Sequence, residues 1–272
     1  MRADAPPLPP GGWQTELSAV VAIAYRDLLK FLRDPARMVS TFIFPLIFIG
    51  ALGGSLQASF GRASSINLLV FTFTGVFAQM LFQTTAFGLI SLLEDRENDL
   101  MQEIFVSPIS RYAIVIGKIV GETLVAIPQA LVVIVFALVV RVELTPSQVL
   151  GLIPTGIAAC LLGGSFGLVV LVNLGSQRAA NQVFPFLVLP QYFLAGVFNP
   201  LAGLPWYLEV LSRISPLRYA VDLVRGVYYA GLPEYERVVL DPPVINLAVT
   251  LGLFVVFVGI GTVLFVRHER NR

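Results

Sequence analysis

The side chains that most often perform chemistry are scarce in this chain of 272 residues. It holds one histidine, His268, in a basic tail, and one cysteine, Cys160, inside an apolar run. Zinc sites and nucleophilic triads need several such groups together, so the usual His- and Cys-based sites are out of reach. The phosphate-binding motif G-x-x-x-x-G-K-[ST] does not occur either. We therefore expect a protein that is not an enzyme, with no catalytic residues, no metal site and no cofactor of its own.

One oppositely charged pair lies inside an apolar run: Lys118 and Glu122. They are four residues apart, so on a helix they face one another and can neutralise each other. This structural pairing is favoured over a proton relay, which would use buried ionisable groups in series. A proton- or sodium-driven carrier would then lack its usual coupling groups. The energy for any transport would have to come from another protein.

The segment 94–111 combines a charge cluster with a short apolar face. It opens as EDREND and continues as LMQEIFVSPISR. The pattern predicts a short helix that stops at Ser107-Pro108, after which Ser110 caps a new helix. Such a helix would lie across the ends of two neighbouring segments, with its apolar face free to dock on a partner. A simple connecting loop is the alternative.

The composition indicates that most of the chain lies in a lipid bilayer. Hydrophobic residues make up 56% of the chain and charged residues only 13%, against about a quarter charged in soluble domains. The net charge of +1 provides no basic surplus, so nucleic acid is not expected as a partner. The chain is therefore expected to be a multi-pass membrane protein.

A helix needs about 20 mostly apolar residues to cross the hydrocarbon core. Six runs fit, which predicts an all-α membrane protein with six transmembrane helices, at residues 38–56, 66–93, 112–140, 147–174, 182–198 and 244–266. The fifth run is short and contains Pro185 and Pro190. Six crossings put both termini on one side. That side would carry 12 of the 18 Lys and Arg residues, which predicts that both termini are cytoplasmic.

Two segments are expected to lie on the membrane surface or dip into it. Residues 13–35 read as an interfacial amphipathic helix after a disordered cytoplasmic tail, 1–12. Its apolar stripe would consist of Leu17, Val20, Val21, Ala24, Leu28 and Phe31, and the opposing basic stripe of Arg26, Lys30, Arg33 and Arg37. Asp34-Pro35 would break this helix before the transmembrane domain, 36–272. An ordinary solvated helix is the alternative.

The second such segment, residues 199–241, is too apolar for a free loop and too broken by proline to span a bilayer. A pair of short, re-entrant helices on the outer side fits best. Two oppositely charged pairs have helical spacing there, and we expect them to be solvated rather than to form a site: Glu209 with Arg213, and Arg218 with Asp222. Glycines four residues apart predict close helix packing: Gly50 with Gly54, and Gly163 with Gly167.

These residues together resemble a known family. Glu94, Arg96-Glu97, Leu100, Glu103, the run VSPISR and Gly117-Lys118 look like the permeases of ATP-binding-cassette type 2 exporters. The stretch LAGVFNPLAGLPWYLEVLSRISPLRYAVDLVRG, from Leu194 to Gly226, resembles the same family. The resemblance covers nearly the whole chain and in places is closest to the daunorubicin-resistance branch. It implies an efflux permease in the cell membrane that pairs with a second permease copy or a homologue.

The resemblance also implies a partner and a coupling site. The partner is a separate nucleotide-binding ATPase subunit on the cytoplasmic side, which would bind the ATP and magnesium. Segment 94–111 would be the coupling helix that fits into this ATPase. The positions that match the family's coupling region are Glu97, Leu100, Glu103, Phe105, Val106, Pro108 and Arg111.

Two other classes of function remain open at this stage. A self-contained channel or secondary carrier should show buried charge or a polar pore face. A non-transporting membrane anchor for an ATPase would use the same docking segment. The candidate substrate pathway consists of Thr72, Gln79, Gln83, Phe87, Phe186, Gln191 and Phe193, with Thr74 and Thr84 on the same predicted surface. This apolar lining with scattered polar groups favours a hydrophobic drug, a lipid or a glycoconjugate over a bare sugar chain.

Overall fold

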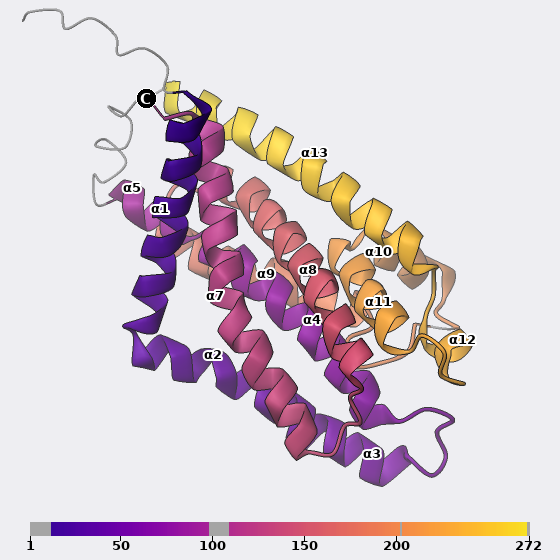
Figure 1. Cartoon of the computed structure of the whole chain (residues 1–272). Coiled ribbons are helices and arrows are strands. Elements are labelled where there is room, and N and C mark those ends of the chain that lie inside the picture. The colour runs from indigo at the N-terminus through magenta and orange to yellow at the C-terminus, as the bar shows by residue number, and fades with distance from the viewer. Residues whose placement is uncertain (1–11, 98–108, 202, 271–272) are drawn as a thin grey trace, which may run out of the picture.

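The computed structural model describes residues 12–97, 109–201 and 203–270. Over these ranges the chain is helical and has no strand, as the sequence predicts. Figure 1 shows the helices, which are α1 Trp13–Leu32, α2 Pro35–Ile47, the π-helix η1 Phe48–Gly53, α3 Gly54–Phe60, α4 Leu68–Gly88, α5 Ser91–Glu97, α7 Arg111–Val139, α8 Pro146–Val172, α9 Gln177–Leu194, α10 Trp206–Ile214, α11 Pro216–Tyr228, α12 Tyr235–Val238 and α13 Pro243–Arg270.

In the described residues, five helical stretches are long and apolar enough to cross a membrane. They are Pro35–Phe60, Leu68–Asp95, Arg111–Val139, Pro146–Val172 and Tyr235–Arg267. Each overlaps one of the predicted runs. The predicted run 182–198 corresponds to α9, which is not among the five because its first turns are polar. The count of six crossings therefore stays a prediction.

The first of these stretches changes its hydrogen bonding midway. The break predicted at Asp34-Pro35 lies between α1 and α2, and Asp34 starts α2 by accepting a hydrogen bond from the backbone N–H of Arg37 at 2.9 Å. Pro45, inside α2, has no N–H to donate to the preceding turn. The π-helical segment η1 comes after α2 and leads directly into α3. Such segments often mark functional sites in helices.

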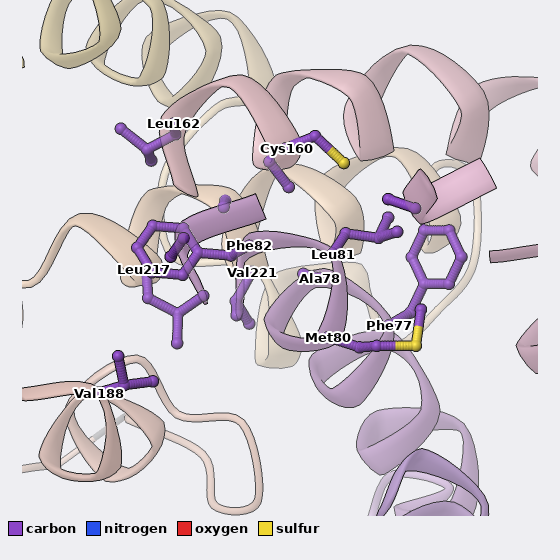
Figure 2. Packing of buried hydrophobic residues seen from close by; sticks show 14 of the residues in the cluster. Phe77, Ala78, Met80, Leu81, Phe82, Cys160, Leu162, Val188, Leu217 and Val221 are labelled. Atoms are coloured by element: carbon purple, nitrogen blue, oxygen red, sulfur yellow. The ribbon is translucent and has the colours of Figure 1, made fainter. Parts of the chain in front are cut away.

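Helix α4 forms the centre of the molecule. Nearly all of its side chains from Val70 to Phe82 are buried, whichever way they point, because α7, α8, α11 and η1 surround it. Figure 2 shows Phe77 and Phe82 of α4 near Cys160 of α8 and Val221 of α11. The Thr85 hydroxyl donates to the Cys160 carbonyl across the α4–α8 contact at 2.7 Å.

The contact between α4 and α8 depends on the predicted glycine pair. A Cβ added at Gly167 would lie only 2.5 Å from the Ala86 carbonyl oxygen. A Cβ added at Gly163 would overlap the carbonyl oxygen of Phe82. The prediction of close packing is confirmed here, within one subunit. Gly50 also lies close to another helix, where its added Cβ would be 3.0 Å from Phe136, whereas Gly54 faces open space.

Helix α1 exists as predicted, and part of its predicted apolar stripe is buried. It packs along α7, where a Cβ added at Gly121 would lie 3.0 Å from the Ala24 Cα. Ala24 and Phe31 of the stripe are buried together with Asp27, whereas Leu17 and Val21 are exposed. Asp27, which the prediction placed in neither stripe, lies three residues after Ala24 and four before Phe31 and so shares their buried face. Placement of α1 at a membrane surface remains a prediction.

The charges of α11 correct another prediction. Arg218 and Asp222, expected to be solvated, are 7% and 2% exposed. They do not pair with each other either: Arg218 approaches Asp241 at 3.8 Å and donates to the Ser212 hydroxyl at 2.9 Å. The pair Glu209–Arg213 does form, at 2.7 Å on an exposed face of α10, as predicted. The apolar pattern of 199–241 therefore buries charged residues as well as apolar ones.

Candidate functional site

The last residues of segment 94–111 are attached to the start of α1. The backbone N–H of Ser110 donates to a carboxylate oxygen of Glu16 at 2.9 Å, and the Ser110 hydroxyl donates to the other oxygen at 2.6 Å. The same hydroxyl accepts from the backbone N–H of Ala113 at 3.1 Å, so Ser110 caps α7 as predicted. One residue thus starts α7 and connects it to α1.

The first residues of the segment are attached to the other half of α1. Asp95, on α5, is 3% exposed and pairs with Arg26 at 2.7 Å and with Lys30 at 3.5 Å. Burial by itself lowers the pKa of Arg26, but the carboxylates of Asp95 and Asp27 outweigh it and hold that pKa above its ordinary value. Arg26 therefore stays charged at any physiological pH, and the link between α5 and α1 persists.

A second, deeper set of ion pairs lies beneath these contacts. The Lys118 ammonium is 2.7 Å from a carboxylate oxygen of Asp27 on α1 and 3.6 Å from Glu122 on its own helix. Glu122 also lies 3.6 Å from Arg37 on α2. The predicted pairing of Lys118 with Glu122 is confirmed, but Asp27 is the closer partner. All three side chains are nearly fully buried, so the pairing compensates a large desolvation cost.

Together these contacts form what we call the α1 charge network: Glu16, Arg26, Asp27, Lys30, Arg37, Asp95, Ser110, Lys118 and Glu122. It connects α1 with α2, α5 and α7 and holds α1 to the residues on both sides of 98–108. The chemistry available to the network is ion pairing between helices.

Most of the predicted coupling residues cannot be placed in this network. Leu100, Glu103, Phe105, Val106 and Pro108 lie outside the described residues, and Glu97 ends α5 with its side chain outside the description. Arg111 is the first residue of α7, directly after the Ser110 cap. Sequence reasoning missed Glu16, Asp27 and Asp95, which make the described contacts. The helical spacing of Ala24, Asp27 and Phe31 was the signal for Asp27.

A cleft of about 460 Å³ opens beside the network. Helices α2, α4, α5, α7 and α9 contribute its lining, which consists of Arg37, Ser40, Thr41, Phe44, Pro45, Met80, Gln83, Thr84, Phe87, Gly88, Ile90, Ser91, Glu94, Gln129, Gln177 and Asn181. Its volume lies within the range of small-molecule sites. Arg37 belongs both to the cleft and to the charge network, so the two are contiguous.

Hydrogen bonds between helices organise the polar side of this cleft. The Thr84 hydroxyl of α4 donates to the Gln129 side-chain carbonyl of α7 at 2.6 Å. The Gln83 side-chain carbonyl accepts from both the Gln79 amide and the Tyr192 hydroxyl of α9. These bonds connect α4 with α7 and with α9 beside the space.

Two of the seven predicted pathway residues, Gln83 and Phe87, line the cleft. Gln79 is buried behind Gln83, to which it donates. The other four lie elsewhere. Thr72 donates to the Leu68 carbonyl at 2.8 Å, Gln191 accepts from Ser215 at 3.4 Å, and Phe186 and Phe193 point outward from α9 with 80% and 59% exposure.

The far end of the molecule has its own buried charges. Arg225 of α11 donates to the Gly196 carbonyl at 2.8 Å, and its guanidinium lies 3.6 Å from the centre of the Phe71 ring. Burial lowers the pKa of Arg225 to about 10, which leaves it protonated at neutral pH. Asp222 accepts from the backbone N–H groups of Leu240 and Asp241, both at 2.9 Å. These charges bind main chain and leave no open site.

Among the residues that the structure describes, no three His, Cys, Asp or Glu side chains gather in a way that would hold a metal ion. The candidate site is therefore defined by ion pairs and by a cleft of mixed polarity.

The family model of ABC-2 type transporters matches residues 18–229, and the chain belongs to this family of transporter membrane components. Among similar proteins is a putative transport permease, ycf38, of Cyanophora paradoxa, 21% identical over 92% of this chain and 88% of that protein. The probable multidrug ABC transporter permease YbhR of Escherichia coli is 29% identical over 51% of this chain and 38% of that protein. Nodulation protein J of Rhizobium meliloti is 24% identical over 81% of this chain and 83% of that protein.

Proposed function

We propose that this chain is the membrane permease of an ABC exporter in the cell membrane, driven by ATP hydrolysis on a separate nucleotide-binding subunit. Two permeases, either two copies or this chain and a homologue, would enclose the pathway. Both termini and the α1 charge network would face the cytoplasm. The chain itself would bind neither ATP nor magnesium.

The observation that carries this proposal is the double attachment of α1 on both sides of 98–108. Asp95 is linked to Arg26 and Lys30, while Ser110 is linked to Glu16. A force that an ATPase exerts on 98–108 would reach α1 through both links, and then the third apolar stretch through Asp27 and Lys118. Coupling of this kind needs a continuous set of contacts between elements that can shift.

Family membership and the multidrug permease YbhR among the relatives support the exporter over the two alternatives. A channel or secondary carrier would use buried charge inside its pathway. The buried charges described here instead connect helices to each other, at the network and on α11. A non-transporting anchor would need the ATPase contact but no cleft.

The first experiment is affinity purification of the tagged chain from native membranes in mild detergents. We expect an ATPase with a phosphate-binding loop at about one copy per permease, because each half-exporter needs its own nucleotide-binding subunit. The complex is then reconstituted in vesicles to test ATP-dependent, directional movement of a substrate. Recovery of the chain without an ATPase in every detergent would contradict the proposal. An ATPase complex without transport would favour the membrane anchor.

The coupling role is tested by charge reversal at Glu103 or Arg111. Both variants should insert into the membrane normally and lose substrate-stimulated ATP turnover, since the contact with the ATPase would become repulsive. Charge reversal at Arg213, which lies on exposed α10 within the pair Glu209–Arg213, is the control. Unchanged transport in the Glu103 and Arg111 variants would remove the coupling role from this segment.

A further inference from the structure

A second hollow of about 650 Å³ lies at the start of α9 and is lined by Ser176, Gln177, Arg178, Asn181 and Gln182. Gln177 and Asn181 line both spaces, so the two hollows are adjacent.

The polar part of the lining is rich in groups that donate and accept hydrogen bonds without charge. It contains the carboxamides Gln83, Gln129, Gln177 and Asn181 and the hydroxyls Ser40, Thr41, Thr84 and Ser91. Because Thr84 donates to the Gln129 carbonyl, the Gln129 amide group keeps its donors for a ligand. Ser40 and Thr41 donate to the Arg37 carbonyl, so their oxygens remain as acceptors. A ligand hydroxyl can use both kinds of group.

The charged part of the cleft lining holds one cation, Arg37, and one anion, Glu94, and the adjacent hollow adds Arg178. Arg37 also has Glu122 at 3.6 Å, so its charge already has a partner within the protein. A strongly anionic or cationic headgroup would meet no excess of opposite charge in the cleft, and desolvating it there would be costly.

The remaining lining is apolar: Phe44, Pro45, Met80, Phe87 and Ile90. Phe44 and Phe87 come from two different helices of the lining, α2 and α4. A ligand that fills the space must therefore carry apolar surface in addition to hydroxyl groups. This combination describes an amphiphile with a neutral, polyhydroxylated headgroup.

We infer that the cleft between α2, α4, α7 and α9 binds an uncharged glycoside-type headgroup whose apolar portion rests against Phe44 and Phe87. This inference rests on the proposed exporter function, and it names the class of molecule that the exporter would carry. The carboxamides recognise the hydroxyl groups, and Arg37 links the occupied cleft to the α1 charge network.

The test uses the full chain with its ATPase in lipid nanodiscs and three photoreactive probes. The probes share one decyl chain with a diazirine next to the headgroup and carry a glucose, a phosphate or a trimethylammonium group. We expect the glucoside to label cleft peptides of α2, α4 or α9 at least about fivefold more strongly than either ionic probe, a preference of about 1 kcal/mol. Equal labelling by an ionic probe would overturn the assignment.

Asn181→Leu and Thr84→Val remove polar groups from the lining. Asn181 is exposed on α9, so its replacement should leave the fold intact even if Thr84→Val does not. Asn173→Leu is the matched control, because Asn173 is an exposed carboxamide outside both hollows. Each lining variant should weaken competition by unlabelled glucoside by about three- to tenfold, as expected for one lost hydrogen bond. Equal affinity in Asn181→Leu and Asn173→Leu would overturn the inference.

The ATPase is quantified in the same samples, which separates the two proposals. A complex that retains its ATPase but takes no glucoside label would refute the cleft assignment and leave the exporter function standing. Specific labelling of the cleft in a chain that recruits no ATPase would refute the exporter function and retain the glycoside site.

Discussion

Buried charges occur at both ends of α13, but their partners differ. α1 and α7 begin beside its C-terminus (Figure 1), and most contacts of the α1 charge network join side chains to side chains, as in the 2.7 Å contact of Asp27 with Lys118. α11 lies near its N-terminus (Figure 1), and there Asp222 and Arg225 bind mainly main-chain groups, those of Leu240, Asp241 and Gly196. Two flexible side chains can keep their contact while helices shift, whereas a main-chain partner fixes one backbone geometry. We therefore expect the first end to move during transport and the second to stay rigid.

The largest effect is expected from Lys118→Met. This change leaves Asp27 and Glu122 as two buried carboxylates without their shared cation. Breaking a buried ion pair on one side costs about 3–5 kcal/mol, so the apparent unfolding temperature in detergent should fall sharply. The double variant Asp27→Leu/Lys118→Met removes both charges and should recover much of that loss. A double variant as unstable as the single one would show that these side chains do not act as an exchangeable pair.

Near the N-terminus of α13, the end expected to be rigid, a second substitution should not recover the stability lost in the first. Asp222→Leu leaves the backbone donors of Leu240 and Asp241 and the Asn246 amide without their acceptor. The expected loss is about 2–3 kcal/mol, the desolvation cost of buried unpaired donors, measured by the same unfolding assay. Adding Asn246→Leu should recover little, because two of the three donors are main chain. Full recovery in that double variant would remove the contrast between the two ends.

The sequence predicts the elements of this fold better than their contacts. Hydropathy and proline positions locate five long apolar helices, because a bilayer-spanning helix needs a run of fixed minimum length. Whether α9 crosses the membrane is harder to predict, since its first turns are polar where they line the cleft. Burial inside a membrane protein is set by neighbouring helices as well as by lipid, and hydropathy does not distinguish the two.

In the candidate site, too, the local features can be predicted from the sequence and the long-range contacts cannot. Ser110 and the pair Lys118–Glu122 follow from local rules, a helix cap and a four-residue spacing. The contacts of Asp27 with Lys118 and of Glu16 with Ser110 join residues more than 90 positions apart. No local rule predicts which charges meet over such separations, because the packing of α1 on α7 decides it. Gln83 and Phe87 were predicted from the residue types in the second apolar run, and both line the cleft. The cleft itself could not be predicted, because five helices far apart in the sequence form its walls.

A moderate effect is expected from Asp95→Asn, which tests whether the flexible end transmits force. Arg26 and Lys30 are partly exposed, with 30% and 51% of their side chains accessible, so solvent screens their pairs with Asp95. The stability change should stay below about 1 kcal/mol. Substrate-stimulated ATP turnover should fall by about fivefold, the lower range of coupling free energies between sites. Normal turnover would exclude Asp95 as a transmitting contact.

A charge swap sharpens that result. Asp95→Arg alone should abolish stimulation by placing three cations together, and Asp95→Arg/Arg26→Asp should restore part of it. The restored fraction should decline as salt is raised, because partly exposed pairs are screened within about 10 Å at 0.1 M. A swap that restores nothing would mean that Asp95 acts through its backbone position on α5 and not through its charge.

The smallest effect is expected at Glu16, whose hydrogen bonds to Ser110 are exposed to solvent. Glu16→Gln keeps an oxygen that can accept from Ser110 but loses the charge, so stability should change by less than about 0.5 kcal/mol. Ser110→Ala removes both this link and the cap of α7, and should cost about 1 kcal/mol. If α1 transmits force through both attachments, ATP stimulation should drop further in Ser110→Ala/Asp95→Asn than in either single variant. Equal stimulation in the double variant and in Asp95→Asn would leave Asp95 as the single working link between α1 and the segment 94–111.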